Sequence, residues 1–249
     1  MTVRLGKRVP LDLLPAAREL TMQATAVVIE QARAKGREIS CKAGCGACCR
    51  QLVVISIVEA LSLVDLVAAL PPDQQRTIRE RFSDALRRLE SARMLDPSRP
   101  KGQRALRMEI KGEVTQQSIA EELVRCYFSQ GIPCPFLENE SCSIHPDRPI
   151  VCREYHVTSP SKDCANLFKV KVNSVQPPLH MSSVLARVIS RSYPTFSSTI
   201  PLVLSLEWAE ANGGQLRQTY DGLEMFQTLL SEIDREHERP FDERTGMGT

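Results

Sequence analysis

Eight of the nine cysteines gather in two stretches of the chain, and the first stretch has the spacing of metal ligands. It reads CKAGCGACC, with gaps of three, two and zero residues between Cys41, Cys45, Cys48 and Cys49. Ligands two or three residues apart can wrap one ion while the backbone between them turns and directs its amides at the sulfurs. Two glycines suit that turn, since glycine alone reaches positive φ without cost. They are Gly44 and Gly46.

The second stretch is spread over a longer, irregular part of the chain. Its thiols are Cys134, Cys142 and Cys152, with Cys164 following shortly after. Residues 131–149 hold four prolines and show little periodicity, so something other than regular secondary structure must order them. We therefore predict that sulfurs from both stretches converge on a shared ion or ion cluster.

The residues leave the identity of the metal open between iron–sulfur and zinc. A C-x3-C-x2-C run is slightly closer to iron–sulfur loops than to zinc knuckles, where paired C-x2-C units are usual. Eight thiolates would overfill a single zinc, which takes four, but they suit two four-cysteine sites or one cluster with spare thiols. Adjacent side chains also diverge, so Cys48 and Cys49 serve one mononuclear ion only with strain. Iron–sulfur is the favoured cofactor and Zn²⁺ the alternative.

Two readings without a metal compete with this one. The thiols would then be a reactive redox pair, or buried apolar groups. Four thiols within nine residues, beside two glycines, are not a core pattern. Cys126 is the exception, because Leu123, Val124 and Tyr127 surround it on a predicted helix, and we expect it to pack in the core.

The elements that must position these thiols are predicted to be mainly helical. Apolar residues recur at helical spacing along most of the chain, and Ser56-x-x-Glu59 is a capping-box pattern. Predicted helices cover 11–35, 56–70, 74–94, 113–128, 179–192, 198–211 and 215–235, short strands 53–57 and 169–175, a linker 96–102, and a turn at Gly213-Gly214. We expect one helical domain over 1–249, with a metal-binding core at about 38–165 and the helices of 166–238 packed on it.

Composition narrows the class of protein. The chain has 249 residues, 42% of them hydrophobic and 25% charged, which is typical of a folded globular protein. A net charge of +2 gives no field that favours nucleic acid or a membrane surface, and the basic stretch 99–107 is interpreted as a solvated helix face. The sequence has neither a secretory signal nor an apolar run long enough to span a bilayer, so we expect a cytoplasmic protein with reduced thiols.

These motifs together resemble the YkgJ-like family, named for its CxxCxxCC cysteine cluster and described as zinc- or iron-chelating proteins. The likeness covers about 38–165. It rests on Cys41-x3-Cys45-x2-Cys48-Cys49-Arg50, Ser56-x-x-Glu59-Ala60, Cys134-Pro-Phe-Leu and Cys142-x-Ile144-His145-x-x-Arg148-Pro149-x-x-Cys152-Arg153. The resemblance implies a metal-binding domain with ligand candidates Cys41, Cys45, Cys48, Cys49, Cys134, Cys142 and Cys152, and with Cys164 as a weaker eighth.

The resemblance also implies a class of activity. Some relatives are fused to, or act as, flagellin lysine methylases that look like iron–sulfur proteins using S-adenosylmethionine, so a protein or peptide substrate is an expectation here. His145 stands where relatives often carry tyrosine, and we expect it to pack rather than to ligate.

Two arginines flank the last cysteine of the motif. Arg148 and Arg153 are candidates to bind cluster sulfides or an anionic substrate; ion pairs with Asp147 and Glu154 are the alternative. A short helix started by Pro149 would place Cys152 in its first turn, where the amides favour a thiolate. No other catalytic motif is present, so whether the protein is an enzyme stays open.

Overall fold

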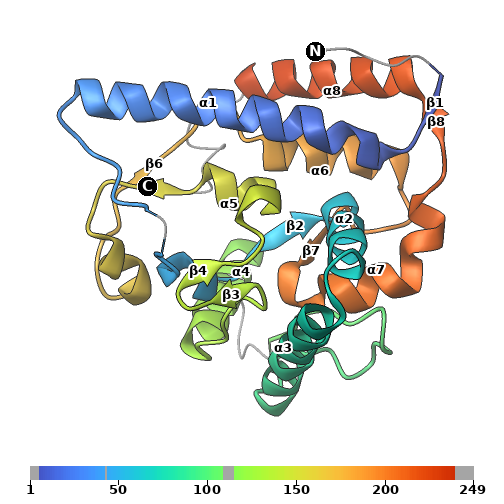
Figure 1. Cartoon of the computed structure of the whole chain (residues 1–249), viewed down its shortest axis with the longest axis horizontal. Coiled ribbons are helices and arrows are strands. Elements are labelled where there is room, and N and C mark those ends of the chain that lie inside the picture. Colours follow the sequence, from blue (N-terminus) through green and yellow to red (C-terminus); the bar gives the residue numbers. More distant parts are fainter. Residues whose placement is uncertain (1–5, 43, 109–114, 239–249) are drawn as a thin grey trace.

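The computed structural model describes residues 6–42, 44–108 and 115–238, and the predicted mainly helical fold is confirmed (Figure 1). The α-helices are α1 (Leu14–Ala34), α2 (Ile57–Ala68), α3 (Pro72–Ser91), α4 (Gln116–Ser129), α5 (Ile150–Glu154), α6 (Met181–Ser192), α7 (Leu202–Leu216) and α8 (Gly222–Glu238). Short 3-10 helices are η1 (Pro10–Leu13), η2 (Ala47–Arg50), η3 (His145–Asp147) and η4 (Ser161–Asn166).

The strands are short and pair two by two. They are β1 (Lys7–Arg8) with β8 (Tyr220–Asp221), β2 (Val54–Ser56) with β7 (Thr199–Pro201), β3 (Leu137–Glu138) with β4 (Ser141–Cys142), and β5 (His156–Val157) with β6 (Ser174–Val175), all antiparallel. No helix within the described ranges is both long enough and apolar enough to cross a membrane.

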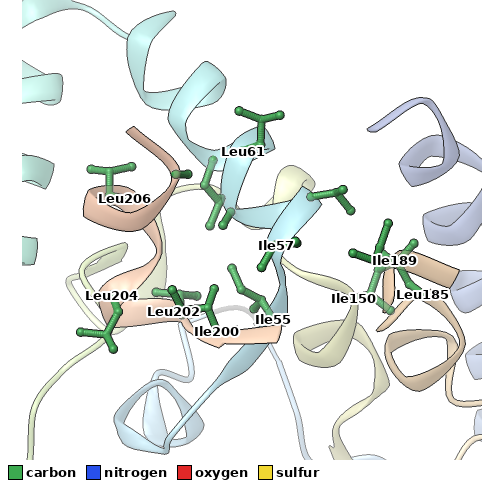
Figure 2. Close-up of a cluster of buried hydrophobic side chains, with 14 of the residues drawn as sticks. Ile55, Ile57, Leu61, Ile150, Leu185, Ile189, Ile200, Leu202, Leu204 and Leu206 are labelled. Atoms are coloured by element: carbon green, nitrogen blue, oxygen red, sulfur yellow. The ribbon is translucent and has the colours of Figure 1, made fainter. Parts of the chain in front are cut away.

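The centre of the core is a pair of strand–helix units. The chain enters α2 directly from β2 and α7 directly from β7, and Ile55 lies opposite Ile200 in the strand pair. Figure 2 shows the apolar side chains of these four elements meeting, with Leu61 on α2 and Leu206 on α7. Burial of such aliphatic side chains is the main favourable term in folding.

Two predictions about α7 were wrong. The helix expected over 198–211 begins only at Leu202, because the residues before it pair with β2 as a strand. Gly213 and Gly214 lie inside the helix rather than in a turn. A Cβ on Gly213 would stand 3.2 Å from the Leu61 side chain, so this glycine permits the close approach of α7 to α2.

Residues 96–102 are irregular, as predicted for a linker, but the helix face predicted over 99–107 was wrong. Segments 96–102 and 99–107 form a loop closed by an isolated antiparallel bridge between its two arms. The turn of this loop is attached to α7: the Gly102 amide donates to Glu207 Oε1 at 2.7 Å, and Asn212 Nδ2 donates to the Gly102 carbonyl at 3.0 Å. Hydrogen bonds to a helix far along the chain give this polar segment a fixed shape that composition does not predict.

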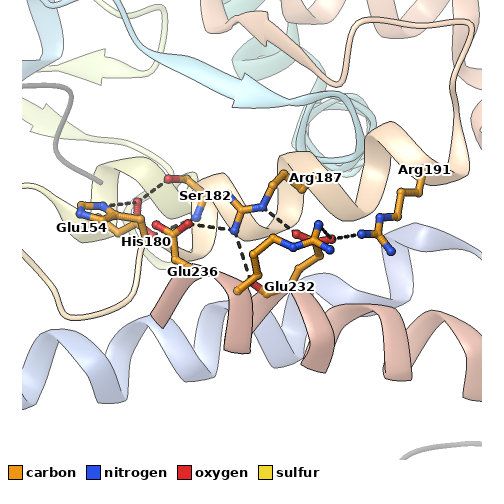
Figure 3. Close-up of polar contacts among 8 residues, drawn as sticks. Glu154, His180, Ser182, Arg187, Arg191, Glu232 and Glu236 are labelled. Atoms are coloured by element: carbon orange, nitrogen blue, oxygen red, sulfur yellow. Dashed lines mark hydrogen bonds and ion pairs between the residues drawn. The ribbon is translucent and has the colours of Figure 1, made fainter. Parts of the chain in front are cut away.

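A second layer consists of α1, α6 and α8, which lie along one side of the molecule (Figure 1). α6 packs on both α1 and α8. Between α6 and α8 the carboxylate of Glu232 is fully buried and accepts from three arginines, Arg187 at 2.7 Å, Arg191 at 2.5 Å and Arg235 at 2.9 Å (Figure 3). Arg187 also pairs with Glu236 at 2.8 Å. A buried carboxylate is tolerated when it is paired in this way.

The substitution Glu232→Gln should lower the free energy of unfolding by about 2–3 kcal/mol, because it leaves three guanidinium groups without their shared charge. The arginines keep part of their surface in water, which holds the cost at or below the lower limit of about 3–5 kcal/mol for a broken buried pair. Urea unfolding followed by circular dichroism measures it. Asp234→Asn, on an exposed position of the same helix, is the control. Equal stabilities of the two variants would contradict this account of the α6–α8 contact.

Candidate metal centre

The first cysteine group lies on a loop and a 3-10 turn. Cys48 and Cys49 are half-buried within η2, while Cys41 is exposed on the preceding loop. Gly44 has a φ of +79°, as predicted for a turn between ligands. Gly46 serves a different purpose: its φ is −96°, but a Cβ there would lie 2.6 Å from Leu137 Cδ1.

The close approach of Gly46 to Leu137 brings the first cysteine group against the second. The backbone amide of Cys134 donates to the carbonyl of Cys49 at 2.7 Å, which joins the two groups directly through the main chain. Beside it, both terminal nitrogens of Arg50 donate to the carboxylate of Glu140, at 3.0 and 2.5 Å. Arg50 also donates to the carbonyl of Gly46 at 3.0 Å. The turn η2 is thus held against the hairpin β3–β4.

The hairpin itself positions Cys142. Its two-residue turn has positive φ at Asn139 (+48°) and Glu140 (+59°), the pattern of the turn that best matches the twist of paired strands. Cys142 lies opposite Leu137 in the register. The proline-rich segment therefore contains a small ordered element, which its composition does not reveal.

Cys152 lies on α5, and a buried carboxylate holds the start of that helix. The helix begins after Pro149, as predicted. Ser56 and Glu59 form the predicted capping box at the start of α2, where Glu59 Oε2 accepts from the Ser56 amide at 3.0 Å. The other oxygen of Glu59 accepts from the amide of Ile150 at 2.8 Å. One side chain thus caps α2 and fixes the first residue of α5.

Apolar and polar contacts hold the rest of α5. The Ile150 side chain is fully buried and lies beside Leu185 of α6 (Figure 2). At the far end, Glu154 accepts from the amide and the hydroxyl of Ser182, at 3.0 and 2.5 Å (Figure 3). Burial raises the pKa of Glu154 to about 7, although the Ser182 bonds oppose this shift. Cys152 therefore sits on a helical turn fixed at both ends.

Cys164 comes from a separate part of the chain, after α5. It is buried in η4, which packs against η2. Burial raises the pKa of Tyr155 to about 12; Gln51 acts against this rise, and charge on the neighbouring Cys164 thiol adds to it. The loop that carries Cys41 is bonded to β5, where the Ser40 amide donates to the Val157 carbonyl at 2.9 Å. Burial raises the pKa of Cys41, and the backbone of Val157 acts against this rise.

The eight thiols lie close enough to influence one another's charge, and Cys48 is common to most of these effects. Burial raises the pKa of Cys134 to about 12, and negative charge on Cys142 and Cys48 adds to the rise. The pKa of Cys152 is raised by burial and by charge on Cys134 and Cys48. Burial and then charge on Cys48 likewise raise the pKa of Cys164. A cation among the sulfurs would reverse these repulsions.

The expectation that helix amides lower the pKa of Cys152 was wrong. Burial and the neighbouring thiols outweigh the amides of a helix only five residues long. The Ile150 amide is also already bonded to Glu59.

The comparison with protein families agrees with this site. A family model described as "CxxCxxCC: putative zinc- or iron-chelating domain" matches residues 40–174, more than half of the chain. The chain belongs to this family. No curated protein and no solved structure gives a significant match. Metal chelation is the property that the family description carries, and the CxxCxxCC domain contains all eight of the candidate thiols.

The donor chemistry of the CxxCxxCC domain fits a metal that prefers sulfur. All nine cysteines are free, and eight of them lie in the part of the chain that the family model matches. Within the described ranges, however, no three histidine, cysteine, aspartate or glutamate side chains already have a ligand arrangement. Ligation at about 2.3 Å from sulfur to zinc would therefore require the side chains to rotate inward.

The two arginines bind protein groups in this structure. Arg153 is buried and donates to the carbonyls of Arg148, at 3.0 Å, and of Pro146. Arg148 lies against the exposed ring of His145. Burial raises the pKa of Cys142, and the positive charge of Arg148 acts against this rise. Neither arginine forms the ion pairs that were the alternative, since Asp147 pairs with Arg18 at 3.4 Å and Glu154 accepts from Ser182. Their role toward a cofactor or an anion stays a prediction.

Cys126 lies apart from the other thiols. It is half-buried on α4, packs against the core, and donates to Glu122 at 3.5 Å.

Sequence reasoning missed the contact partners of the site rather than its thiols. The link from Glu59 to α5 and the Tyr155–Cys164 contact join residues far apart in sequence or on separate elements, and only the capping box gave a signal for one of them.

Glu59→Gln should lower the free energy of unfolding by about 2 kcal/mol, because an amide has one acceptor oxygen where the carboxylate uses two. It should also weaken the order of α5. Urea unfolding measures the first effect, and hydrogen exchange at the Ile150 amide the second. Asp65→Asn, on the exposed face of the same helix, is the matched control. Unchanged protection of the Ile150 amide in Glu59→Gln would refute the link.

Proposed function

We propose that this protein holds a metal centre on cysteines from its two stretches, and that the centre is an iron–sulfur cluster. The supporting observation is the meeting of the two groups around η2: Cys134 is hydrogen-bonded to Cys49, and the thiols of Cys142 and Cys152 lie within range of the charge on Cys48. Cysteine thiolates hold iron–sulfur clusters, four to a cluster, so these eight thiols are more than enough for one, and half-buried surroundings tune such clusters.

Zinc is the second candidate. Four thiolates also make a closed structural zinc site, and the family description names zinc beside iron. In that case the protein is a non-catalytic module, serving as a metal carrier or an interaction scaffold. Either metal would tie the proline-rich segment to the first loop, so the structural consequence of binding is the same.

A groove supports a catalytic use of the centre in protein or peptide modification. It has a volume of about 440 Å³ and runs between α3 and residues 132–137, with Cys134 in its wall. Charged side chains of both signs, among them Arg81 and Asp84, line the opposite wall on α3. An extended peptide lying in this groove would reach one side of the cysteine group. Peptide binding measured with and without Asp84→Arg tests this part, because the variant blocks the groove without touching a thiol.

The location of the protein follows from the same chemistry. Thiols must be reduced to bind metal, and nine free cysteines suit a reducing compartment. We therefore propose a cytoplasmic protein that acts as one domain, with α6, α7 and α8 as the support of the metal-binding part.

Metal analysis of protein purified without oxygen tests the proposal. We expect a brown protein with absorbance near about 400 nm and bound iron and sulfide, as is usual for thiolate-bound clusters. Cys45→Ala and Cys142→Ala, one from each stretch, should each lower the metal content, whereas Cys126→Ala should leave it unchanged. A colourless protein with stoichiometric zinc would support the second candidate. Protein without any bound metal, or full metal content in both variants, would refute both.

A further inference from the structure

The loop that follows α3, residues 93–107, lines a cavity that the metal centre does not use. The last turn of α3 and both arms of the loop form its walls, and its volume is about 370 Å³. This volume lies in the lower part of the range for small-molecule sites, about 300–1,000 Å³. Among the described residues no cysteine lines the cavity. Its cationic lining residues are Arg93, Arg99, Lys101, Arg104 and Arg107.

Hydrogen bonds give this loop a fixed shape. Its arms are joined by the amide of Asp96, which donates to the carbonyl of Ala105 at 3.0 Å, and by the amide of Arg107, which donates to the carbonyl of Met94 at 2.8 Å. The tip between the arms is bonded to α7, beside which the loop lies (Figure 1). The cationic side chains are therefore carried by a preformed frame, so a ligand binds them without having to order the backbone.

Arg93 occupies a backbone position that favours glycine. α3 ends in a Schellman motif, in which the amide of Met94 donates to the carbonyl of Leu89 and the amide of Arg93 to that of Glu90, both at 2.9 Å. The φ of Arg93 is +56°, in the left-handed region where a side chain costs free energy and glycine does not. The helix end alone does not call for an arginine here. The residue therefore indicates a use for its charged side chain, which lines the cavity.

Positive charge in the cavity is only partly neutralised. In the described lining five cationic side chains face two acidic ones, and Glu207 adds a third carboxylate from α7. The closest approach is 3.5 Å between Arg99 and Asp96 and 3.6 Å between Arg104 and Glu207, both longer than a good hydrogen bond. An anion with two or more negative charges would balance the excess of two positive charges.

The residue types favour phosphate among such anions. Four of the five cationic residues described in the lining are arginines, and a guanidinium group can bind two phosphate oxygens at once. A nucleic acid would need a basic surface that continues beyond the cavity. The exposed face of α3 does not supply one, because each of its arginines there pairs with an acidic side chain. These are Arg76, Arg79, Arg81 and Arg87.

We propose that the cavity between the end of α3 and the loop 93–107 binds a small anion that bears phosphate and carries at least two negative charges. Arg93 and Arg99 contact its oxygens. An inorganic polyphosphate and the phosphate group of an organic molecule share this chemistry. The site is separate from the metal centre, and it does not depend on the proposed function.

Isothermal titration calorimetry of the full-length protein at constant ionic strength tests the proposal, with inorganic pyrophosphate and glycerol 2-phosphate as probes. We expect saturable binding of at least one probe, which Arg93→Gly and Arg99→Gln each weaken about tenfold, as expected for one lost charge-assisted contact. Tighter binding of pyrophosphate indicates an inorganic polyphosphate as the ligand, and tighter binding of the ester indicates an organic phosphate. Arg33→Gln removes the same charge from α1, which lies on the opposite side of the molecule (Figure 1), and should bind as the wild type does.

The melting temperature of Arg93→Gly separates a binding role from a structural one. It should equal or exceed that of the wild type, because glycine relieves the strained backbone. A lower melting temperature would overturn the role given to Arg93. Absence of saturable binding, or equal dissociation constants in the wild type and both cavity variants, would overturn the site. Tighter binding of a DNA duplex, weakened by the same variants, would overturn the small-anion ligand. Metal content should be the same in all four proteins, so a failure of the metal centre would leave this result unchanged.

Discussion

The carboxylate of Glu59 is the contact on which the geometry of the site depends. It is buried, and its two oxygens serve two elements that are far apart in the chain: one accepts from Ser56 at the start of α2, the other from Ile150 at the start of α5. A buried carboxylate is costly unless hydrogen bonds replace its water, and here main-chain amides do so. The strand β2 leads straight into α2 and pairs with β7, so Glu59 couples the central core to the turn that carries Cys152.

α5 shows why such anchoring is necessary. A helix of five residues cannot form alone, because nucleation costs more than so few hydrogen bonds return. Its order is imposed from outside, by Glu59 at one end, by Ser182 against Glu154 at the other, and by Ile150 in the apolar core. The same principle governs the proline-rich segment. The residue that leads into its hairpin, Cys134, donates its amide to the carbonyl of Cys49 in the first cysteine stretch. Each cysteine stretch therefore helps to order the other.

The sequence predicted the local features well and the long-range ones poorly. Several local features follow from short-range rules and are present in the structure. They are the Ser56–Glu59 capping box, the helices α1 before it and α2 after it, and the start of α5 after Pro149. The helix over 198–211 was expected to begin too early, because pairing with β2 outweighs helical propensity there. Gly46 was assigned to a turn of positive φ, but it is needed for a close contact with a hairpin about ninety residues away, which no local rule detects. The candidate thiols were identifiable from spacing, while the elements that bring them together were not.

The energetics of the thiols give the physical case for a metal. Burial raises the pKa of Cys134 and Cys152, and each thiolate formed nearby makes the next one harder to form. A protein with no use for thiolates gains nothing from collecting eight thiols in such a place, since valine or alanine would fill the space without that cost. A divalent cation changes the sign of the interaction, because every thiolate it attracts lowers the cost of the others, and binding then contributes to folding. On this argument the proposed ion would supply the positive charge that offsets the repulsion among thiolates of the cysteine loop, the hairpin and α5.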